Sequence, residues 1–134
     1  MIHAFPVTVH YEDTDLSGMV YHANYLKFIE RARSDWVRRL GLDQNAMRAE
    51  GVVFAVHRIE ADFLAPARLD DRLDVRTDAV ARTPARITLA QTVHRGAICL
   101  FRARVTLVAM TPEGRPRRLP SALGHIPVSI GEIL

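Results

Sequence analysis

One amphipathic stretch, residues 25–40, constrains the fold more than any other feature of the sequence. Its apolar side chains recur at three- and four-residue steps, and charged side chains fill the remaining positions. This spacing predicts a helix with a single apolar stripe, which Gly41 is suited to end. Asn24 stands directly before the stretch and is the predicted N-cap. Because the stripe must be buried against a second layer, the rest of the chain has to supply that layer.

Strand patterns account for most of the chain after the helix. Polar and apolar residues alternate over 53–64, 72–82, 86–94 and 97–110, with Pro and Gly turns between these runs. The last three runs predict an antiparallel meander, and the first predicts a strand with one buried face. Asp43 is expected to cap a short helix that reaches Glu50, and a further strand is expected over 7–11. The predicted class is therefore α+β.

Composition indicates a single small domain over residues 1–134. At 49% hydrophobic content, a chain of this length buries roughly two thirds of its unfolded surface. Cys99 stands alone in an apolar run, which favours a buried structural thiol and excludes an internal disulfide. No run of eighteen apolar residues and no signal sequence is present, so a soluble cytoplasmic protein without a transmembrane segment is expected. The net charge of +3 is spread along the chain, which favours a phosphate-bearing substrate over nucleic acid.

The tail over residues 111–134 differs in composition from the rest. Its prolines and glycines are expected to break any regular element. Arg115, Arg117 and Arg118 form a small basic cluster there, for which two interpretations stand: a solvated surface, or a contact to phosphate or to a partner.

The segment over residues 11–25 combines carboxylates, a glycine turn and a histidine just before the helix, which is typical of an active-site loop. Asp15 and His22 are seven residues apart, and Gly18 lets the chain reverse between them. Both side chains could then converge beside the helix start, where free N–H groups can hold an oxyanion. Asp15 would be ionised and act as a base or nucleophile, with its pKa raised if Asp13 lies close. Such a site suits hydrolysis of an activated acyl group.

A structural role remains open for both residues. Asp15 could form an Asx turn with the backbone near Ser17, and His22 could donate to a backbone carbonyl at the helix entry. Asp13 is expected to be a turn or supporting residue.

Other chemistries match the sequence less well. The run from Asp13 to Val20 copies the first eight positions of an EF-hand loop, but Asn24 replaces the bidentate Glu and a strand precedes the loop. The histidines and Cys99 lack zinc-ligand spacing, and no Gly-x-Ser-x-Gly motif is present. No metal site is therefore predicted.

Three segments resemble the 4-hydroxybenzoyl-CoA thioesterase superfamily, and within it the YbgC-type branch associated with the Tol-Pal system. They are residues 11–25, the Glu-Arg-Ala-Arg run at 30–33, and the Ala-Pro-Ala-Arg-Leu-Asp-Asp run at 65–71. The similarity extends from about Phe5 to Leu119. It implies the hotdog fold, an antiparallel five-stranded sheet wrapped around a long central helix.

The resemblance also implies an activity, namely hydrolysis of acyl-CoA thioesters to a free acid and coenzyme A without a metal or organic cofactor. Asp15 occupies the family's catalytic position, the second Asp of Asp-x-Asp-x-x-Gly. His22 occupies the position of a functional histidine of the branch. The thioester carbonyl would point at the N–H groups around Tyr21 and His22. Sequence leaves open whether Asp15 activates water or forms a mixed anhydride.

Substrate-binding positions follow from the same resemblance. Gly18, Val20 and Tyr21 are expected at the acyl pocket, whose shape also depends on Phe54 and on a partner subunit. A role in the core is the open alternative for Val20 and Tyr21. Family members place basic residues on the coenzyme A phosphates where this chain has Arg82 and Arg86. The alternative for these two arginines is a solvated hairpin edge.

The family's site lies between two subunits whose sheets join edge to edge, so a homodimer or homotetramer is expected. Acyl carrier protein is a possible alternative carrier of the acyl group. A different class of function is a non-catalytic hotdog module that binds acyl groups or partners.

Overall fold

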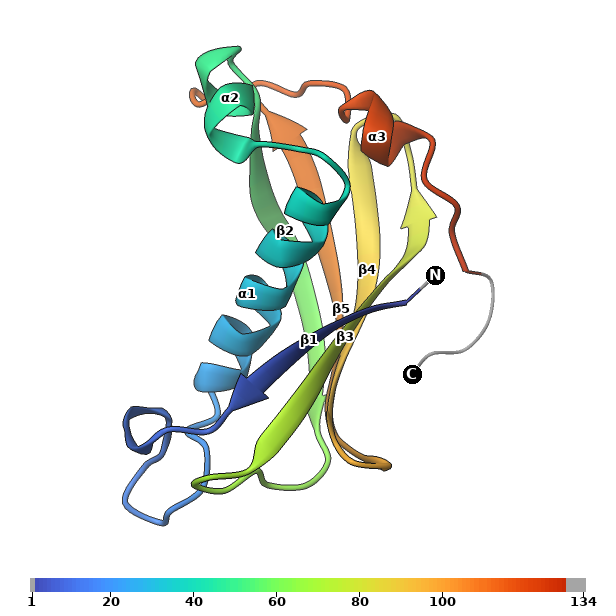
Figure 1. Cartoon of the computed structure of the whole chain (residues 1–134). Coiled ribbons are helices and arrows are strands. Elements are labelled where there is room, and N and C mark those ends of the chain that lie inside the picture. The colour runs from blue at the N-terminus through green and yellow to red at the C-terminus, as the bar shows by residue number, and fades with distance from the viewer. Residues whose placement is uncertain (1, 130–134) are drawn as a thin grey trace.

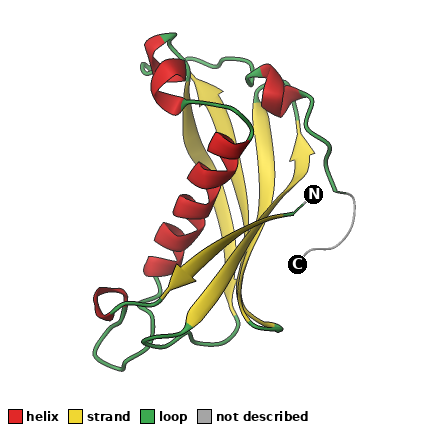
Figure 2. Ribbon diagram, in the orientation of Figure 1, coloured by secondary structure: helices red, strands yellow, loops and turns green. Residues whose placement is uncertain are grey.

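An antiparallel sheet of five strands curves around one long helix (Figures 1 and 2). The computed structural model of the chain describes residues 2–129. A single 3₁₀ turn, Tyr11–Asp13, lies between the first strand and the long helix. The elements in chain order are β1 (His3–Thr8), α1 (Asn24–Arg39), α2 (Gln44–Ala49), β2 (Val53–Phe63), β3 (Arg72–Arg82), β4 (Arg86–Arg95), β5 (Ile98–Met110) and α3 (Ser121–Gly124).

The sheet has the strand order β1-β3-β4-β5-β2. Strands β3, β4 and β5 form the predicted meander, whereas β2 lies at the far edge beside β5, with Ile59 opposite Val105. The apolar stripe of α1 is buried, and Phe28, Ile29 and Ala32 have no exposed surface. The predicted α+β hotdog architecture is confirmed.

A buried polar network sets the position of α1 on the sheet. The Gln91 side chain donates through Nε2 to the carbonyl of Ile29, at 2.9 Å, and to the Thr77 hydroxyl, also at 2.9 Å. Its Oε1 accepts from Arg33 Nη1 at 3.0 Å. Burial lowers the pKa of Arg33. Breaking a hydrogen bond of a buried polar group destabilises the folded protein, so this network holds the helix in one register on the sheet.

The start of α1 differs from the prediction that Asn24 is its N-cap. Ala23 occupies the cap position and makes no side-chain cap hydrogen bond, and Asn24 is the first helical residue. The Asn24 side chain instead donates through Nδ2 to Asp13 Oδ1 at 2.7 Å. Because Asn24 is already helical, it does not act as the cap, and its amide nitrogen instead donates to a charged acceptor, which makes a strong hydrogen bond. Gly41, at φ +86°, follows the last turn as predicted.

Strand β1 begins and ends earlier than the predicted range of 7–11. It contains Pro6, which lies opposite Asp74 of β3. Because β1 is an edge strand, it is one of the few places in a sheet where proline is tolerated. The chain leaves the sheet at Val9 and His10, where the backbone N–H of His10 donates to Asp13 Oδ2 at 2.8 Å and starts the 3₁₀ turn.

Strand β2 lacks the buried face that its alternation predicted. Phe54 and Ile59 pack only partly against the core, and Val56 and Phe63 remain 47% and 55% exposed. The reason is that α1 packs mainly against β1, β3 and β4 and leaves β2, the last strand of the sheet, less covered.

The tail is more ordered than its proline and glycine content predicted. Leu119 and Leu123 are buried, the latter in the single turn of α3. The backbone N–H of Leu119 donates to the carbonyl of Pro84 at 2.8 Å, so the tail packs against the turn between β3 and β4. The tail is therefore anchored at Leu119 and Leu123, whereas residues 112–118, with the three arginines, are exposed as the solvated interpretation predicted. Residues 130–134 lie outside the described residues.

Candidate active site

The loop before α1 reverses direction at Gly18, as the sequence predicted. Thr14 and Val20 form an isolated antiparallel β-bridge. The N–H of Asp15 donates to the carbonyl of Met19 at 2.9 Å, and the N–H of Gly18 donates to the backbone carbonyl of Asp15 at 3.0 Å. Gly18 has φ +80°, and an added Cβ would meet nothing within 4 Å. The requirement for glycine is therefore conformational rather than steric.

Asp13 anchors this loop from inside. It is only 3% exposed, and its two carboxylate oxygens accept from His10 N and Asn24 Nδ2. Its backbone carbonyl accepts from the N–H of Tyr21 at 2.9 Å. Asp13 thus joins the end of β1, the loop and the first turn of α1, which is the supporting position predicted for it.

A cavity of about 390 Å³ opens between the loop, the start of α1 and the end of β2. Asp15 and His22 both line it, so the two residues that the sequence singled out face one volume. Their chemical roles stay predictions. The lining residues are Asp15, Met19, Val20, His22, Tyr25, Phe63, Leu64, Ala65 and Pro66.

Aromatic rings form one wall of the cavity. Phe63 contacts Tyr25 edge to face at 5.7 Å between ring centroids and lies 6.3 Å from the His22 ring. Tyr25 stacks on Phe101 at 4.9 Å, and its hydroxyl accepts from the N–H of Ala67 at 3.0 Å. Burial raises the pKa of Tyr25. Sequence reasoning missed Phe63, whose only signal was its place at the end of a strand pattern.

The environment of Asp15 corrects the expectation that its pKa is raised. Its Oδ1 accepts from the backbone N–H of Ser17 at 2.8 Å and from the Ser17 hydroxyl. These two bonds stabilise the carboxylate and lower the pKa of Asp15, with a small further contribution from His22. Asp13 is not among the groups that shift the pKa of Asp15. Within residues 2–129, Asp15 Oδ2 accepts no hydrogen bond and is free to contact a ligand.

The backbone donors near the cavity also differ from the prediction. The N–H of Tyr21 is occupied by the carbonyl of Asp13, so it cannot hold an oxyanion. The N–H groups of His22 and Ala23 have no acceptor among the described residues. The Tyr21 ring packs against His22, at 4.6 Å between centroids, and does not line the cavity, whereas Val20 does.

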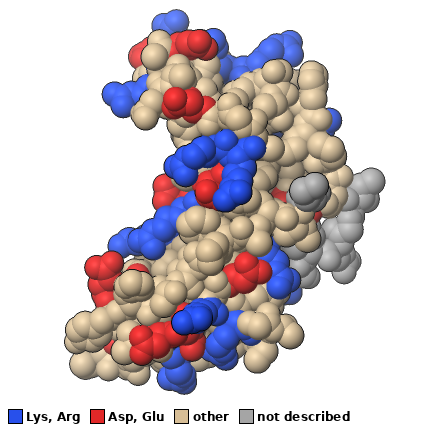
Figure 3. Space-filling model, in the orientation of Figure 1, with Lys and Arg blue, Asp and Glu red and all other residues tan. Residues whose placement is uncertain are grey.

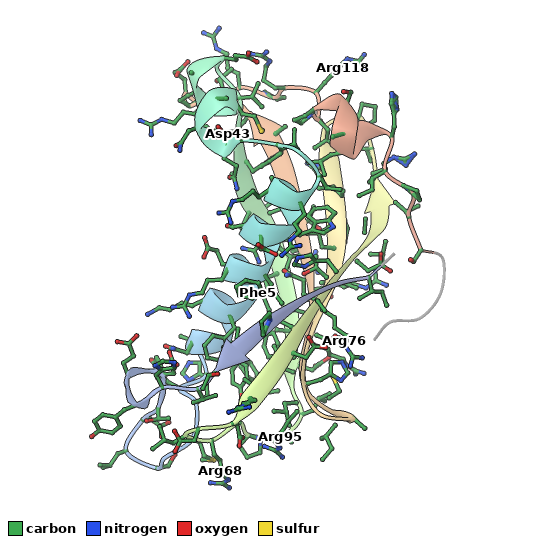
Figure 4. The ribbon with its side chains drawn as sticks, viewed as in Figure 1. Phe5, Asp43, Arg68, Arg76, Arg95 and Arg118 are labelled. Carbon is green, nitrogen blue, oxygen red and sulfur yellow. The ribbon has the colours of Figure 1, made fainter. Side chains whose placement is uncertain are left out.

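Arg82 and Arg86 lie at the other end of the sheet from this cavity. They line a separate cleft of about 290 Å³ together with His57 and Arg58. Strand β3 has 11 residues, and at a strand rise of about 3.3 Å per residue its two ends are roughly 33 Å apart. One chain therefore does not bring these arginines to Asp15. Figure 4 shows the two ends, with Arg68 and Arg95 near the loop and Arg118 at the other end.

Phe54 also lies apart from the Asp15 cavity. It lines a different cavity, of about 200 Å³, with Glu30 and Arg33. The shape of the acyl pocket was expected to depend on how Phe54 packs, but within one chain Phe54 does not line the Asp15 cavity.

Charges are dispersed on the face seen in Figure 3, where acidic and basic side chains alternate. Residues 2–129 contain no group of three or more His, Cys, Asp or Glu side chains arranged to hold a metal ion. In the same range, no helix has the length and apolar character needed to cross a membrane. Cys99 is a free, half-buried thiol.

Comparison with known proteins places the chain in a family. The profile of the thioesterase-like superfamily matches residues 9–126. The acyl-CoA thioester hydrolase YbgC of Escherichia coli is 38% identical over 121 residues, covering 89% of this chain and 90% of that protein. The acyl-CoA thioesterase YbgC of Haemophilus influenzae is 36% identical over 129 residues, covering 92% of this chain and 95% of that protein.

Solved structures agree with the sequence comparison. A probable thioesterase from Bartonella henselae superposes with a TM-score of 0.85 at 37% identity, covering 90% of this chain and all of that one. A 1,4-dihydroxy-2-naphthoyl-CoA thioesterase from Synechocystis has the same fold, with a TM-score of 0.85 at 23% identity. The match covers 92% of this chain and 93% of that one. The profile match, the identities and the shared fold together show that this chain belongs to the thioesterase-like superfamily.

Proposed function

We propose that this chain hydrolyses acyl-CoA thioesters to a free carboxylic acid and coenzyme A. The observation that carries the proposal is the shared cavity, in which an ionised carboxylate and a histidine face an apolar and aromatic wall beside the start of a helix. The YbgC relatives from Escherichia coli and Haemophilus influenzae, named for this activity, support the choice of substrate class.

Asp15 supplies the reactive carboxylate. Its lowered pKa keeps it ionised at neutral pH, and Oδ2 is the oxygen that remains available. It either takes a proton from water, which attacks the thioester carbon, or attacks that carbon itself to form a mixed anhydride that water then hydrolyses. In both routes a C–O bond forms, the C–S bond breaks, and the thiolate leaves and collects the proton.

The N–H groups of His22 and Ala23 hold the developing oxyanion. Both lie in the turn that leads into α1, where the positive end of the helix dipole adds to their effect. The His22 ring, held between Tyr21 and Phe63, orients the water or the thioester oxygen.

The acyl group lies against the apolar wall built by Val20, Tyr25, Phe63 and Leu64. The coenzyme A phosphates are held by the basic cleft that contains Arg82 and Arg86. Because these arginines lie far from Asp15 of their own chain, the partner subunit supplies them. Acyl carrier protein is an alternative carrier, which presents the same thioester without the nucleotide.

A homodimer joined through β2 makes this sharing possible. The strand lies at the sheet edge, is 11 residues long, and its outer side has no neighbour among the described residues. A two-fold axis across its middle pairs two copies antiparallel and brings opposite ends of the two chains together. Two such dimers would form a tetramer.

Thiol release from short, long and aromatic acyl-CoAs tests the proposed activity. Asp15→Asn should reduce kcat by about a hundredfold or more, and His22→Ala by about tenfold to a hundredfold. Asp74→Asn is the matched control, since Asp74 pairs with Arg76 on the sheet and does not line the cavity; it should retain wild-type turnover. Equal activity in Asp15→Asn and Asp74→Asn would contradict the assignment of Asp15.

One observation favours a second candidate, a non-catalytic module that binds acyl groups. The Asx turn with Ser17 gives Asp15 a complete structural role without any chemistry. Absence of turnover on every thioester by the folded wild-type chain, together with saturable binding of acyl-CoA, would establish that candidate instead.

A further inference from the structure

The segment that joins β2 to β3 supports the loop before α1. The N–H of Val20 donates to the carbonyl of Ala67 at 2.8 Å, and Met19 and Arg68 form an isolated antiparallel bridge. Ala67 is fully buried, so this contact lies inside the molecule. Residues 65–71, the support segment, therefore hold the arm of the loop that returns toward the helix.

Two side chains from other elements fasten the support segment. Tyr25, in the first turn of α1, accepts a hydrogen bond from the N–H of Ala67 through its hydroxyl, at 3.0 Å. Arg95, the last residue of β4, donates through Nη1 to the carbonyl of Pro66 at 3.2 Å and to Asp71 Oδ2 at 2.9 Å. The support segment is thereby tied to the helix and to the sheet. Figure 4 shows Arg95 at the end of the molecule that carries the loop.

Asp71 closes the support segment on itself. The oxygen that accepts from Arg95 also accepts from the N–H of Arg68, at 2.8 Å. Asp70 has φ +70°, a left-handed conformation that is uncommon outside glycine. The N–H of Asp70 donates to the carbonyl of Val9 at 3.0 Å, and the N–H of Val9 donates to the carbonyl of Asp71 at 2.9 Å. The shape of the segment therefore depends on contacts with the rest of the molecule.

The Tyr25 ring is a rigid anchor because aromatic neighbours fix it. It stacks on Phe101 at 4.9 Å between ring centroids and meets Phe28 edge to face at 6.1 Å. Burial raises the pKa of Tyr25, so its hydroxyl is neutral at physiological pH. Loss of this hydroxyl would leave the buried N–H of Ala67 without its acceptor, which is unfavourable.

We propose that Tyr25 and Arg95 are positioning residues for the reaction at Asp15. They fix the support segment, the support segment fixes the loop through Val20, and the loop sets where the carboxylate stands in the cavity. The same segment supplies two residues of the cavity wall. Displacement of a catalytic group by about 1 Å can lower a rate by about a hundredfold. The assignment rests on the proposed function, because it concerns the geometry of that reaction.

Steady-state kinetics with an acyl-CoA test the assignment. Arg95→Gln should lower kcat by about tenfold and change KM by less than about twofold, because substrate contacts stay in place while the carboxylate loses its alignment. Arg95→Lys should restore part of the lost turnover, since lysine keeps the charge and a donor. Tyr25→Phe should also lower kcat, because the support segment loses its bond to the helix.

Arg102→Gln is the matched control. The side chain of Arg102 is 39% exposed, against 37% for Arg95, and its Nε donates to Asp62 Oδ2 at 3.1 Å. Arg102 follows Phe101 in β5, so it points to the opposite face of the sheet from the ring that stacks on Tyr25. This variant should retain wild-type kcat.

Amide hydrogen exchange separates positioning from a general loss of stability. Arg95→Gln should speed exchange of the Val20 amide, whose acceptor lies on the support segment, by about tenfold. The acceleration should exceed that of Leu89, a buried residue of β4. Unchanged kcat, unchanged Val20 exchange, or equal acceleration at both amides would overturn the proposal. A folded wild type without turnover on any thioester would instead defeat the proposed function.

Discussion

At the scale of single residues, Asp15 has two roles that depend on the same contacts. The bonds from Ser17 shape the loop and also stabilise the negative charge of the carboxylate. A carboxylate with a lowered pKa is ionised over a wider pH range but is a weaker base. This environment is compatible with attack on a thioester, which needs an ionised oxygen more than a strong base.

Ser17→Ala should raise the pKa of Asp15, because the largest stabilising contact of the carboxylate is removed. The acid limb of kcat/KM should then move to higher pH, since Asp15 becomes protonated earlier as the pH falls. A carbon-13 NMR titration of the Asp15 carboxyl measures the change directly. Ser34→Ala, on α1 away from the loop, serves as control, and an Asp15 pKa that is the same in all three proteins would refute the attribution to Ser17.

At the scale of elements, the junction between the loop and α1 depends on one buried side-chain bond. Asn24→Ala removes the donor to Asp13 Oδ1 and leaves a buried carboxylate oxygen without its partner. The free energy of unfolding should fall by about 1–3 kcal/mol. Urea denaturation of Asn24→Ala beside Asn45→Ala, an exposed position of α2, measures this, and similar losses in the two variants would show that the bond is unimportant.

A second contact between elements joins β1 to α1. His3 Nε2 lies 2.7 Å from Asp35 Oδ2, and Arg39 Nε donates to the same oxygen at 3.3 Å. The hydrogen bond from His3 is the largest cause of the lowered pKa of Asp35. A group whose folded-state pKa is depressed contributes stability above its unfolded pKa and loses it as the pH falls through the folded pKa.

Asp35→Asn should therefore lower Tm at neutral pH, and the difference from wild type should shrink as the pH falls below the ordinary aspartate pKa of 3.8. Calorimetric melting curves recorded from pH 7 down to pH 3 measure the difference. A difference in Tm that stays constant across this range would mean that the ionised carboxylate of Asp35 adds nothing to stability.

At the scale of the whole molecule, the open edge of β2 is the feature that an assembly must cover. Val56→Arg places a charge on the exposed part of this strand and should shift the proposed dimer toward monomer. Ile98→Arg, at the exposed first residue of β5, is the control. Sedimentation equilibrium of both variants and the wild type provides the measurement; a dimer that persists in Val56→Arg would point to a different interface.

Much of the fold could be predicted from the sequence because helix and strand periodicities are local. The stripe from Tyr25 to Trp36 lies on α1, and the alternations that ended at Arg82 and began at Arg86 match β3 and β4. The family assignment is confirmed as well, since its motifs are contiguous runs. The loop over residues 11–25 was identified because its carboxylates, glycine and histidine stand close together in the chain.

Only the tertiary structure decided which distant residues share a site. Phe63 reaches the Asp15 cavity because the end of β2 lies beside the start of α1, where Phe63 contacts Tyr25. Asn24 turns to Asp13 and not to its own helix, and Arg82 meets the tail 42 residues later in the chain. Each of these contacts depends on strand order, on register and on competition between donors for a buried charge. Periodicity reports which face of an element is apolar, but the partner of that face is chosen by packing over the whole chain.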